Sequence, residues 1–206
     1  MEIKTYLALG DSYTIGEQVP LAESFPYQAV QLLRKADISL EKNQHVFAAP
    51  EIIAKTGWTT DELTAAIGQT IFLPKYDMVS LLIGVNNQYR GRPVDEFENE
   101  FKVLLQMAIQ FAGGIAGNVF VLSIPDWGVT PFAKDRDIEK IAKEIDDYNK
   151  VCERTAAGFK THYIDITSHQ RLDGGKADFL AADGLHPSGK EYRKWAESLS
   201  RLVLAG

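Results

Sequence analysis

The sequence is poor in cysteine, in long apolar runs and in clustered positive charge. Cys152 is the only cysteine among 206 residues, so an internal disulfide framework is excluded. No stretch approaches the roughly 20 apolar residues that are needed to cross a bilayer. The formal charge is −6, with 22 basic and 28 acidic side chains interspersed, so there is no basic stripe for a phosphate backbone. These absences argue against a disulfide scaffold, a membrane-spanning protein and a nucleic-acid partner.

Targeting and cofactor motifs are missing as well. The apolar part of the N-terminus, "MEIKTYLALGDS", is too short for a signal peptide and has no small-residue cleavage site. This favours a cytoplasmic location, with a secreted form that lost a leader before Met1 left open. Neither a Gly-x-Gly-x-x-Gly motif nor a P-loop is present to hold phosphates. The oligomeric state is not indicated.

Apolar runs of strand length alternate with longer segments of helical periodicity. The expected strands span 3–9, 46–54, 77–83, 118–124 and 162–166, and the expected helices 24–36, 59–68, 93–112, 135–158 and 188–204. Since the strands are almost entirely apolar, the pattern predicts a parallel sheet covered by helices on both faces. Pro50 indicates an edge strand or a break in the second run. No linker divides the chain, so we expect one three-layer α/β/α domain over residues 1–206.

Two helix starts carry a capping-box pattern. Thr59 and Glu62 are expected to open the helix at 59–68, and Ser188 and Glu191 the last helix.

Polar residues follow the expected strands. Ser12 ends the segment Gly10-Asp11-Ser12 after the first strand, Gly57 follows the second, and Asn86 follows the third. Asp183 and His186 lie just before the last helix. Because ligands bind beyond the carboxyl ends of parallel strands, we expect these five residues to share one site.

Their side chains are the ones that a serine hydrolase needs. Ser12 is a poor nucleophile unless a base such as His186 takes its proton, and a carboxylate such as Asp183 orients that base. An oxyanion needs donors that are already in place, and we expect the backbone N–H groups of Ser12 and Gly57 and the side-chain amide of Asn86 to supply them.

These motifs resemble the SGNH hydrolase superfamily, the GDSL-type esterases and lipases. Its blocks are matched in order by Gly10-Asp11-Ser12, by Gly57, by Gly84-Val85-Asn86 and by Asp183-Gly184-Leu185-His186. The third block of the family ends in aspartate, where this chain has Asn87. An asparagine can still accept a hydrogen bond through its carbonyl oxygen.

The resemblance implies a flavodoxin-like three-layer sandwich with a five-stranded parallel sheet. It also implies hydrolysis of carboxylic esters or thioesters through an acyl-enzyme, without a cofactor or metal. Members of the family cleave simple esters, lysophospholipids, thioesters and acetylated sugars. The chain has no appended carbohydrate-binding segment or lid, which favours a small, short-acyl ester as substrate.

Other interpretations of the same residues stay open. Ser12 and Asp11 are common turn formers, and Asp11 suits a supporting role. Arg90 and Arg92 offer charge for an anionic substrate group, or are simply exposed. Trp58 lines the pocket or acts as a hydrophobic staple on Leu63. Substrate contacts are expected from aromatic residues near the strand ends: Tyr13, Trp58, Tyr89, Trp127 and Phe132.

Two other functions compete with ester hydrolysis. Asp11, Asn86, Asp183 and His186 are also metal-ligand types, as in metal-dependent phosphoesterases, although no His-x-x-His or His-Glu-x-x-His pattern accompanies them. A flavodoxin-like module that binds a ligand without turnover is the other alternative. An α/β-hydrolase is excluded because Thr14 replaces the last glycine of the Gly-x-Ser-x-Gly elbow.

Overall fold

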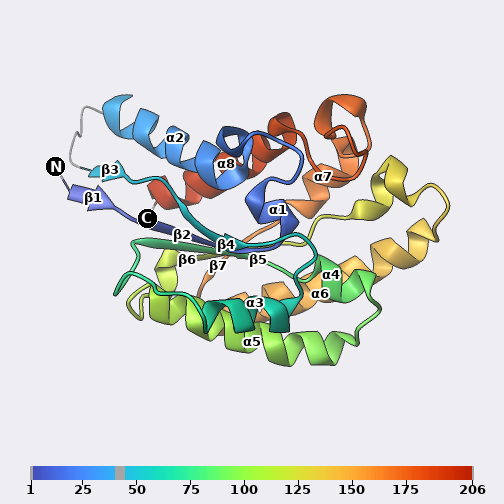
Figure 1. The fold of residues 1–206 in the computed structure, drawn as a ribbon, viewed down its shortest axis with the longest axis horizontal. Helices are drawn as coiled ribbons and strands as arrows, with labels where there is room; N and C mark the ends of the chain where they lie inside the picture. Colours follow the sequence, from blue (N-terminus) through green and yellow to red (C-terminus); the bar gives the residue numbers. More distant parts are fainter. Residues whose placement is uncertain (1, 40–44, 206) are drawn as a thin grey trace.

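The computed structural model describes residues 2–39 and 45–205, and its centre is a sheet of five parallel strands (Figure 1). The strands follow the order β4-β2-β5-β6-β7 across the sheet. This is the 2-1-3-4-5 order of flavodoxin-like folds, counted within the sheet. The predicted α/β fold is therefore confirmed. The strands are β2 (Tyr6–Gly10), β4 (Glu51–Ala54), β5 (Met78–Leu82), β6 (Val119–Leu122) and β7 (His162–Ile164).

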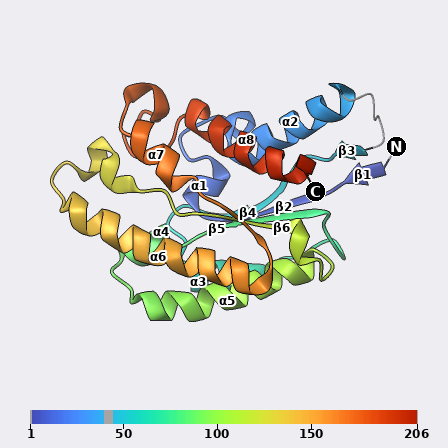
Figure 2. The same ribbon diagram turned by 180° about the vertical axis from the view of Figure 1, so that it is seen from behind.

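Helices cover both faces of the sheet, as Figures 1 and 2 show from opposite sides. One layer holds α1 (Ser12–Ile15), α2 (Phe25–Ser39), α7 (Thr167–Asp173) and α8 (Gly189–Ala205). The other holds α3 (Thr60–Ile67), α4 (Val85–Tyr89), α5 (Val94–Phe111) and α6 (Ile138–Phe159). Short 3-10 turns lie at Leu21–Glu23, Ala116–Asn118, Trp127–Val129, Pro131–Ala133 and Ala177–Phe179.

Two of the expected strands are each divided. The first breaks at Thr5 into β1 (Glu2–Lys4) and β2, because Asp77 accepts from the Thr5 N–H at 2.8 Å and from its hydroxyl at 3.0 Å. The second breaks around Pro50 into β3 (His45–Phe47) and β4, and β4 is an edge strand, as the proline indicated. β1 and β3 pair with each other in a separate two-stranded sheet.

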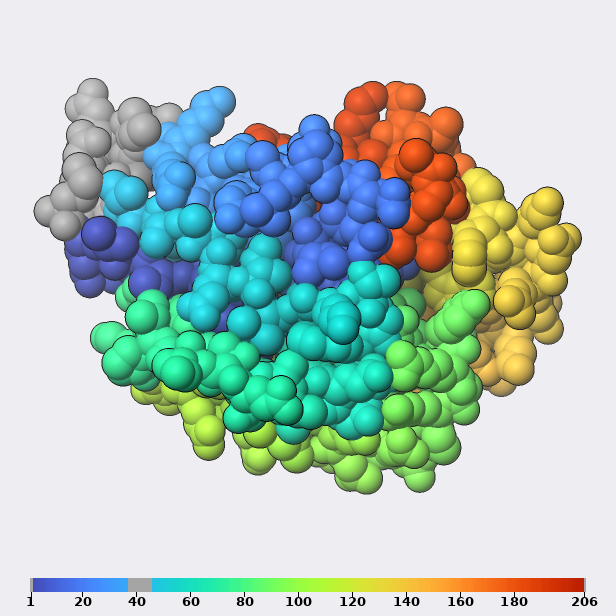
Figure 3. Space-filling view, in the orientation of Figure 1, coloured from blue at the N-terminus to red at the C-terminus, as the bar shows by residue number. Residues whose placement is uncertain are grey.

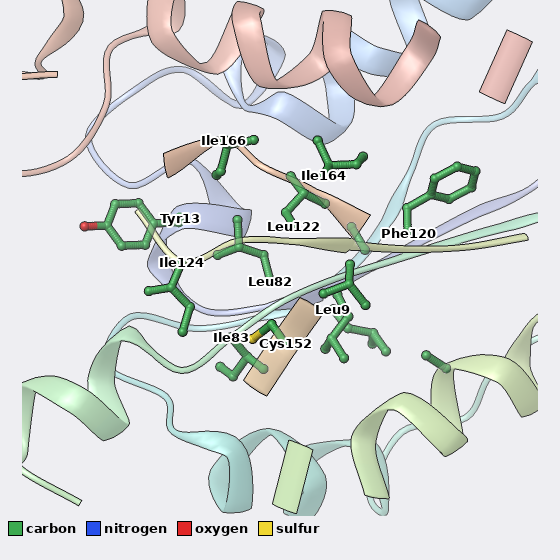
Figure 4. Close-up of a cluster of buried hydrophobic side chains, with 14 of the residues drawn as sticks. Leu9, Tyr13, Leu82, Ile83, Phe120, Leu122, Ile124, Cys152, Ile164 and Ile166 are labelled. Atoms are coloured by element: carbon green, nitrogen blue, oxygen red, sulfur yellow. The ribbon is translucent and has the colours of Figure 1, made fainter. Parts of the chain in front are cut away.

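The core lies between the sheet and its two helical layers. Every residue of β2, β5 and β6 is buried, as expected for a sheet covered on both faces. Figure 4 shows Leu9, Leu82 and Leu122 among the clustered side chains, with Tyr13 at one end and its hydroxyl pointing away from them. Cys152 lies in this core, where burial raises the pKa of its thiol, so it is held as an unreactive apolar residue.

Asn149 of α6 fastens the segment that follows β6 at the carboxyl edge of the sheet. Its Oδ1 accepts from the Ile124 N–H at 2.7 Å, and its Nδ2 donates to the Ile124 carbonyl at 3.0 Å and to the Thr167 hydroxyl at 3.1 Å. One buried amide thus bonds both backbone groups of Ile124, which cannot reach water, and the Thr167 hydroxyl shares the carbonyl with it.

We expect Asn149→Ala to lower the free energy of unfolding by about 1–3 kcal/mol, because the buried Ile124 N–H loses its acceptor while the Ile124 carbonyl keeps only the Thr167 hydroxyl, 2.8 Å away. Denaturant unfolding measures the change. Lys150→Ala, at the next position on the same helix, removes only an exposed pair with Asp147 and should cost under about 0.5 kcal/mol. Equal losses in the two variants would contradict this role of Asn149.

Candidate active site

A pocket of about 200 Å³ opens at the carboxyl edge of the sheet. It brings together Ser12, Gly57, Asn86 and His186 from four separate segments. In Figure 3, the blue segment after β2, the turquoise segment after β4 and the orange-red segment before α8 meet on one face. The lining residues are Ser12, Tyr13, Thr56, Gly57, Val85, Asn86, Tyr89, Trp127, Phe132, Leu185 and His186.

Ser12 is the first residue of α1, the short helix that begins where β2 ends. Asp11 caps this helix, with its Oδ1 accepting from the Tyr13 N–H at 3.0 Å. Gly10 is needed for space, since a Cβ there would lie 2.1 Å from the Thr14 hydroxyl oxygen. The Gly-Asp-Ser segment therefore has a structural residue at each of its first two positions, and its third residue faces the pocket.

Asp183 and His186 form a compact pair in the loop before α8. The His186 Nδ1 lies 2.6 Å from Asp183 Oδ2, and Asp183 Oδ1 accepts from the Leu185 and His186 N–H groups at 3.0 Å each. Burial acts to raise the pKa of Asp183, but the His186 bond and the two backbone bonds outweigh it and hold the pKa below its ordinary value. A carboxylate at this position fixes Nδ1 as a donor, so Nε2 is left to accept a proton.

Tyr13 supports the His186 ring from the side. The two ring centroids lie 5.5 Å apart, tilted by 57°, and Tyr13 packs in turn on Trp195 of α8 at 6.1 Å. The Ala181 N–H also donates to the His186 carbonyl at 2.8 Å. His186 is therefore held in place by Tyr13 against its ring, by Asp183 at Nδ1 and by the Ala181 N–H at its carbonyl.

Three hydrogen-bond donors are available at the pocket. Gly57 has φ +84°, a conformation that favours glycine, and its backbone N–H has no acceptor among the described residues. The Ser12 N–H, at the start of α1, likewise has none within the described chain. Asn86 Nδ2 donates one hydrogen to the Trp58 carbonyl at 3.0 Å, which leaves its second hydrogen unused.

Asn87 stands where the family pattern has aspartate, and it is fully buried. Its Oδ1 accepts from the Thr60 N–H at 3.1 Å, which is the acceptor role expected of an asparagine here. Its Nδ2 donates to the Thr60 hydroxyl at 2.6 Å, and that hydroxyl donates to Glu100. The amide thus joins the start of α3 to α5 through one threonine.

Aromatic residues form one wall of the pocket. Trp127 packs between Tyr89, at a centroid distance of 5.3 Å, and Phe132, at 6.0 Å. Its indole N–H donates to Gln88 Oε1 at 2.8 Å, which fixes the ring plane. Trp58 is not among the lining residues: its side chain is half-buried against the core.

Thr56, Val85 and Leu185 also line the pocket, and sequence reasoning did not single them out. They carry no motif of their own. The available signal was their position next to Gly57, Asn86 and His186 in the chain.

The two expected capping boxes have different outcomes. At α3 the box is confirmed, with the Thr59 N–H donating to Glu62 Oε2 at 2.9 Å. At α8 it is wrong. Ser188 donates its N–H to the Phe179 carbonyl and its hydroxyl to the Asp178 carbonyl, while Glu191 Oε1 accepts from the Trp195 indole at 3.0 Å. Contacts with the preceding loop therefore occupy Ser188, and a contact within α8 occupies Glu191.

The two loop arginines are already paired within the protein. Arg90 Nη2 donates to the Gly57 carbonyl at 2.6 Å and lies 3.3 Å from Glu62 Oε2. Arg92 donates to Asp61 Oδ1 at 2.6 Å. Their guanidinium groups are therefore engaged with protein oxygens beside the pocket.

Among residues 2–39 and 45–205, no three or more His, Cys, Asp or Glu side chains gather closely enough to hold a metal ion. No helix in that part of the chain is long and apolar enough to span a membrane.

We expect Asp11 to make folding stability depend on pH. Burial raises the pKa of its carboxyl to about 7, although the Tyr13 N–H acts to lower it, and Oδ2 has no partner within the described residues. A raised carboxyl pKa favours the folded state below the unfolded value near pH 4, and that benefit is lost as the pH rises through 7. Asp11→Asn should therefore gain stability relative to the wild type between pH 4 and 8. Chemical unfolding across this range measures it, and parallel pH curves would refute it.

We expect Asn87→Asp to lower the free energy of unfolding by about 1–3 kcal/mol. The Thr60 hydroxyl has one hydrogen, so it cannot donate to carboxylates at both 87 and 100. Adding Glu100→Gln supplies a donor and removes one charge, and should restore most of the loss. Unfolding of the two single variants and the double variant gives the coupling energy, and strictly additive effects would show that the three groups do not interact.

The chain is similar to known lipases and acylhydrolases over most of its length. The GDSL-like lipase/acylhydrolase family matches residues 8–194 of the chain. A curated relative, the spore germination lipase LipC of Bacillus licheniformis, is 21% identical over 211 residues, which cover 94% of this chain and 93% of that protein.

Solved structures share the fold over nearly the whole chain. TesA superimposes with a TM-score of 0.69 at 20% identity, covering 97% of this chain and 98% of that one. Axe2, an acetylxylan esterase from Geobacillus stearothermophilus, gives a TM-score of 0.71 at 19% identity, covering 98% and 96%. The chain therefore belongs to the GDSL-like lipase/acylhydrolase family and is a carboxylic ester hydrolase.

Proposed function

We propose that this chain hydrolyses short-acyl esters through an acyl-enzyme on Ser12. His186 is the base, Asp183 orients it, and Ser12 N–H, Gly57 N–H and Asn86 Nδ2 form the oxyanion hole. The observation that carries the proposal is the shared pocket, in which Ser12 and the Asp183-bound His186 lie beside donors that have unused hydrogens.

The reaction runs in two halves. In the first, His186 Nε2 takes the proton of Ser12 as its Oγ attacks the ester carbonyl, and the imidazolium then gives that proton to the leaving alcohol. In the second, His186 takes a proton from water as the water oxygen attacks the acyl-enzyme, and returns it to Ser12 when the acid leaves. The Asp183 carboxylate stabilises the imidazolium in both halves, which its lowered pKa supports.

The oxyanion forms twice, and preorganised donors stabilise it each time. Removing one such donor costs roughly 10²–10³ in kcat in a measured case. Asn86→Ala should accordingly lower kcat more than it raises KM, because the bond strengthens only as charge develops on the carbonyl oxygen.

The size and lining of the pocket support a small acyl group. A cavity of about 150 Å³ binds benzene, so a pocket of about 200 Å³ holds a group of that size or slightly larger. Val85, Leu185 and the aromatic wall offer an apolar surface to the chain of the acid. Since the relatives include a lipase and an acetylxylan esterase, acetylated sugars, lysophospholipids and thioesters belong in the test panel.

We expect p-nitrophenyl esters of increasing chain length to give the highest kcat/KM between roughly two and six acyl carbons, because an acyl group of that size fits within the pocket. Acetylated sugars, a lysophospholipid and an acyl thioester are assayed beside them. A preference for acyl chains of 12 or more carbons would contradict the short-acyl part of the proposal and leave the mechanism standing.

Ser12→Ala should lower kcat by at least roughly 10³-fold and abolish labelling by a fluorophosphonate probe, because the acyl-enzyme cannot form. Thr14→Ala, two residues on, changes a buried hydroxyl outside the pocket lining and serves as the labelling control. Wild-type turnover in Ser12→Ala would overturn the mechanism. Turnover that survives in Ser12→Ala and disappears with a chelator would favour the metal-dependent alternative.

A further inference from the structure

Gly57 lies in a tight turn, residues 55–58, which we call the Gly57 turn. The Trp58 N–H donates to the Lys55 carbonyl at 3.2 Å, and Gly57 has φ +84° at the third position. This is the pattern of a type II turn. The peptide at the centre of such a turn carries the Gly57 N–H, and a flip to type I would reverse the direction of that donor.

Side-chain contacts hold the two residues that this central peptide joins, Thr56 and Gly57. On one side the Thr56 hydroxyl donates to Glu17, in the segment after α1. On the other side Arg90 Nη2 donates to the Gly57 carbonyl at 2.6 Å. The guanidinium is itself held by Glu62, 3.3 Å away, which the α3 capping box keeps in place.

Arg90 and Asn86 act on adjacent carbonyls of the Gly57 turn. They lie four positions apart along α4 and its last turn, so they face the same side. Asn86 donates to the Trp58 carbonyl at 3.0 Å, and Arg90 donates to the Gly57 carbonyl. Asn86 and Arg90 thus bind the turn that carries the Gly57 N–H, and Asn86 is itself another of the oxyanion donors.

Stability alone does not account for this arrangement. The Arg90 side chain is 42% exposed and its partner Glu62 40%, and an ion pair with that exposure contributes little to folding. Water can replace the arginine as a donor to the Gly57 carbonyl, but water does not fix the orientation of the peptide. The contact therefore serves to fix the orientation of the Gly57 carbonyl.

We propose that Arg90 is a positioning residue of the oxyanion hole: it locks the Gly57 turn against α4, so that the Gly57 N–H and Asn86 Nδ2 are held at a fixed separation. This rests on the proposed function. Arg90 touches neither the substrate nor the reacting atoms, and it acts through Gly57.

Arg90→Gln should lower kcat about tenfold with KM within about twofold, which is less than the roughly 10²–10³-fold loss of a whole oxyanion donor. Arg90→Lys keeps a charged donor and should recover part of the loss. Arg154→Gln removes an exposed arginine that pairs with Glu98, away from the pocket, and should behave as wild type. Thermal unfolding of all three should match the wild type.

The specific readout is a transition-state analogue. In Arg90→Gln the affinity for an alkyl boronic acid, which forms a tetrahedral adduct on serine, should fall by the same factor as kcat/KM. Binding of the product carboxylic acid should not change. A purely structural role would weaken both ligands or lower the unfolding temperature.

The outcomes separate the two proposals. If wild type and Arg90→Gln show equal kcat and equal boronic acid affinity, Arg90 does not position the oxyanion hole, whatever the mechanism. If Ser12→Ala retains wild-type turnover, the proposed mechanism fails, and the Arg90 proposal fails with it.

Discussion

All strands of the five-stranded sheet run in one direction, so each segment that leaves a strand in the forward direction emerges at the same edge. This brings Ser12, Asn86 and His186, from the beginning, middle and end of the chain, to one pocket. Full burial of β2, β5 and β6 keeps the arrangement fixed, because a shift of one residue would turn each strand's side chains to the opposite face. The geometry of the site is therefore a product of the packing of the sheet.

Long patterns made most of the fold predictable from sequence. The five long helices lie within a few residues of their expected ranges, because each repeats its apolar spacing over two or more turns. The helices α1, α4 and α7 have four, five and seven residues, too few to show a period. The division at Thr5 depends on Asp77, 72 positions away, and no local pattern carries such a contact.

At the site, the candidate catalytic residues could be predicted from the sequence, but the residues that hold them in place could not. Ser12, Gly57 and Asn86 stood out because they follow the expected strands, and His186 because it lies with Asp183 just before the last helix. The contact of Arg90 with the Gly57 carbonyl could not be foreseen, since an exposed arginine has many possible partners. The capping box at Ser188 failed for a related reason: Asp178 and Trp195 compete for its two groups, and only the folded chain decides between them.

The pairing of Asp183 with His186 is local, since three positions separate them and backbone bonds in the same loop hold the carboxylate. The alignment of that pair with Ser12 and Gly57 is entirely non-local. The Asp183–His186 loop can therefore keep its own hydrogen bonds and still be inactive, unless β2, β4 and β5 are in register and place Ser12 and Gly57 beside it. Opening of the sheet should then abolish turnover, so residual activity sets a lower limit on the fraction of molecules that remain folded.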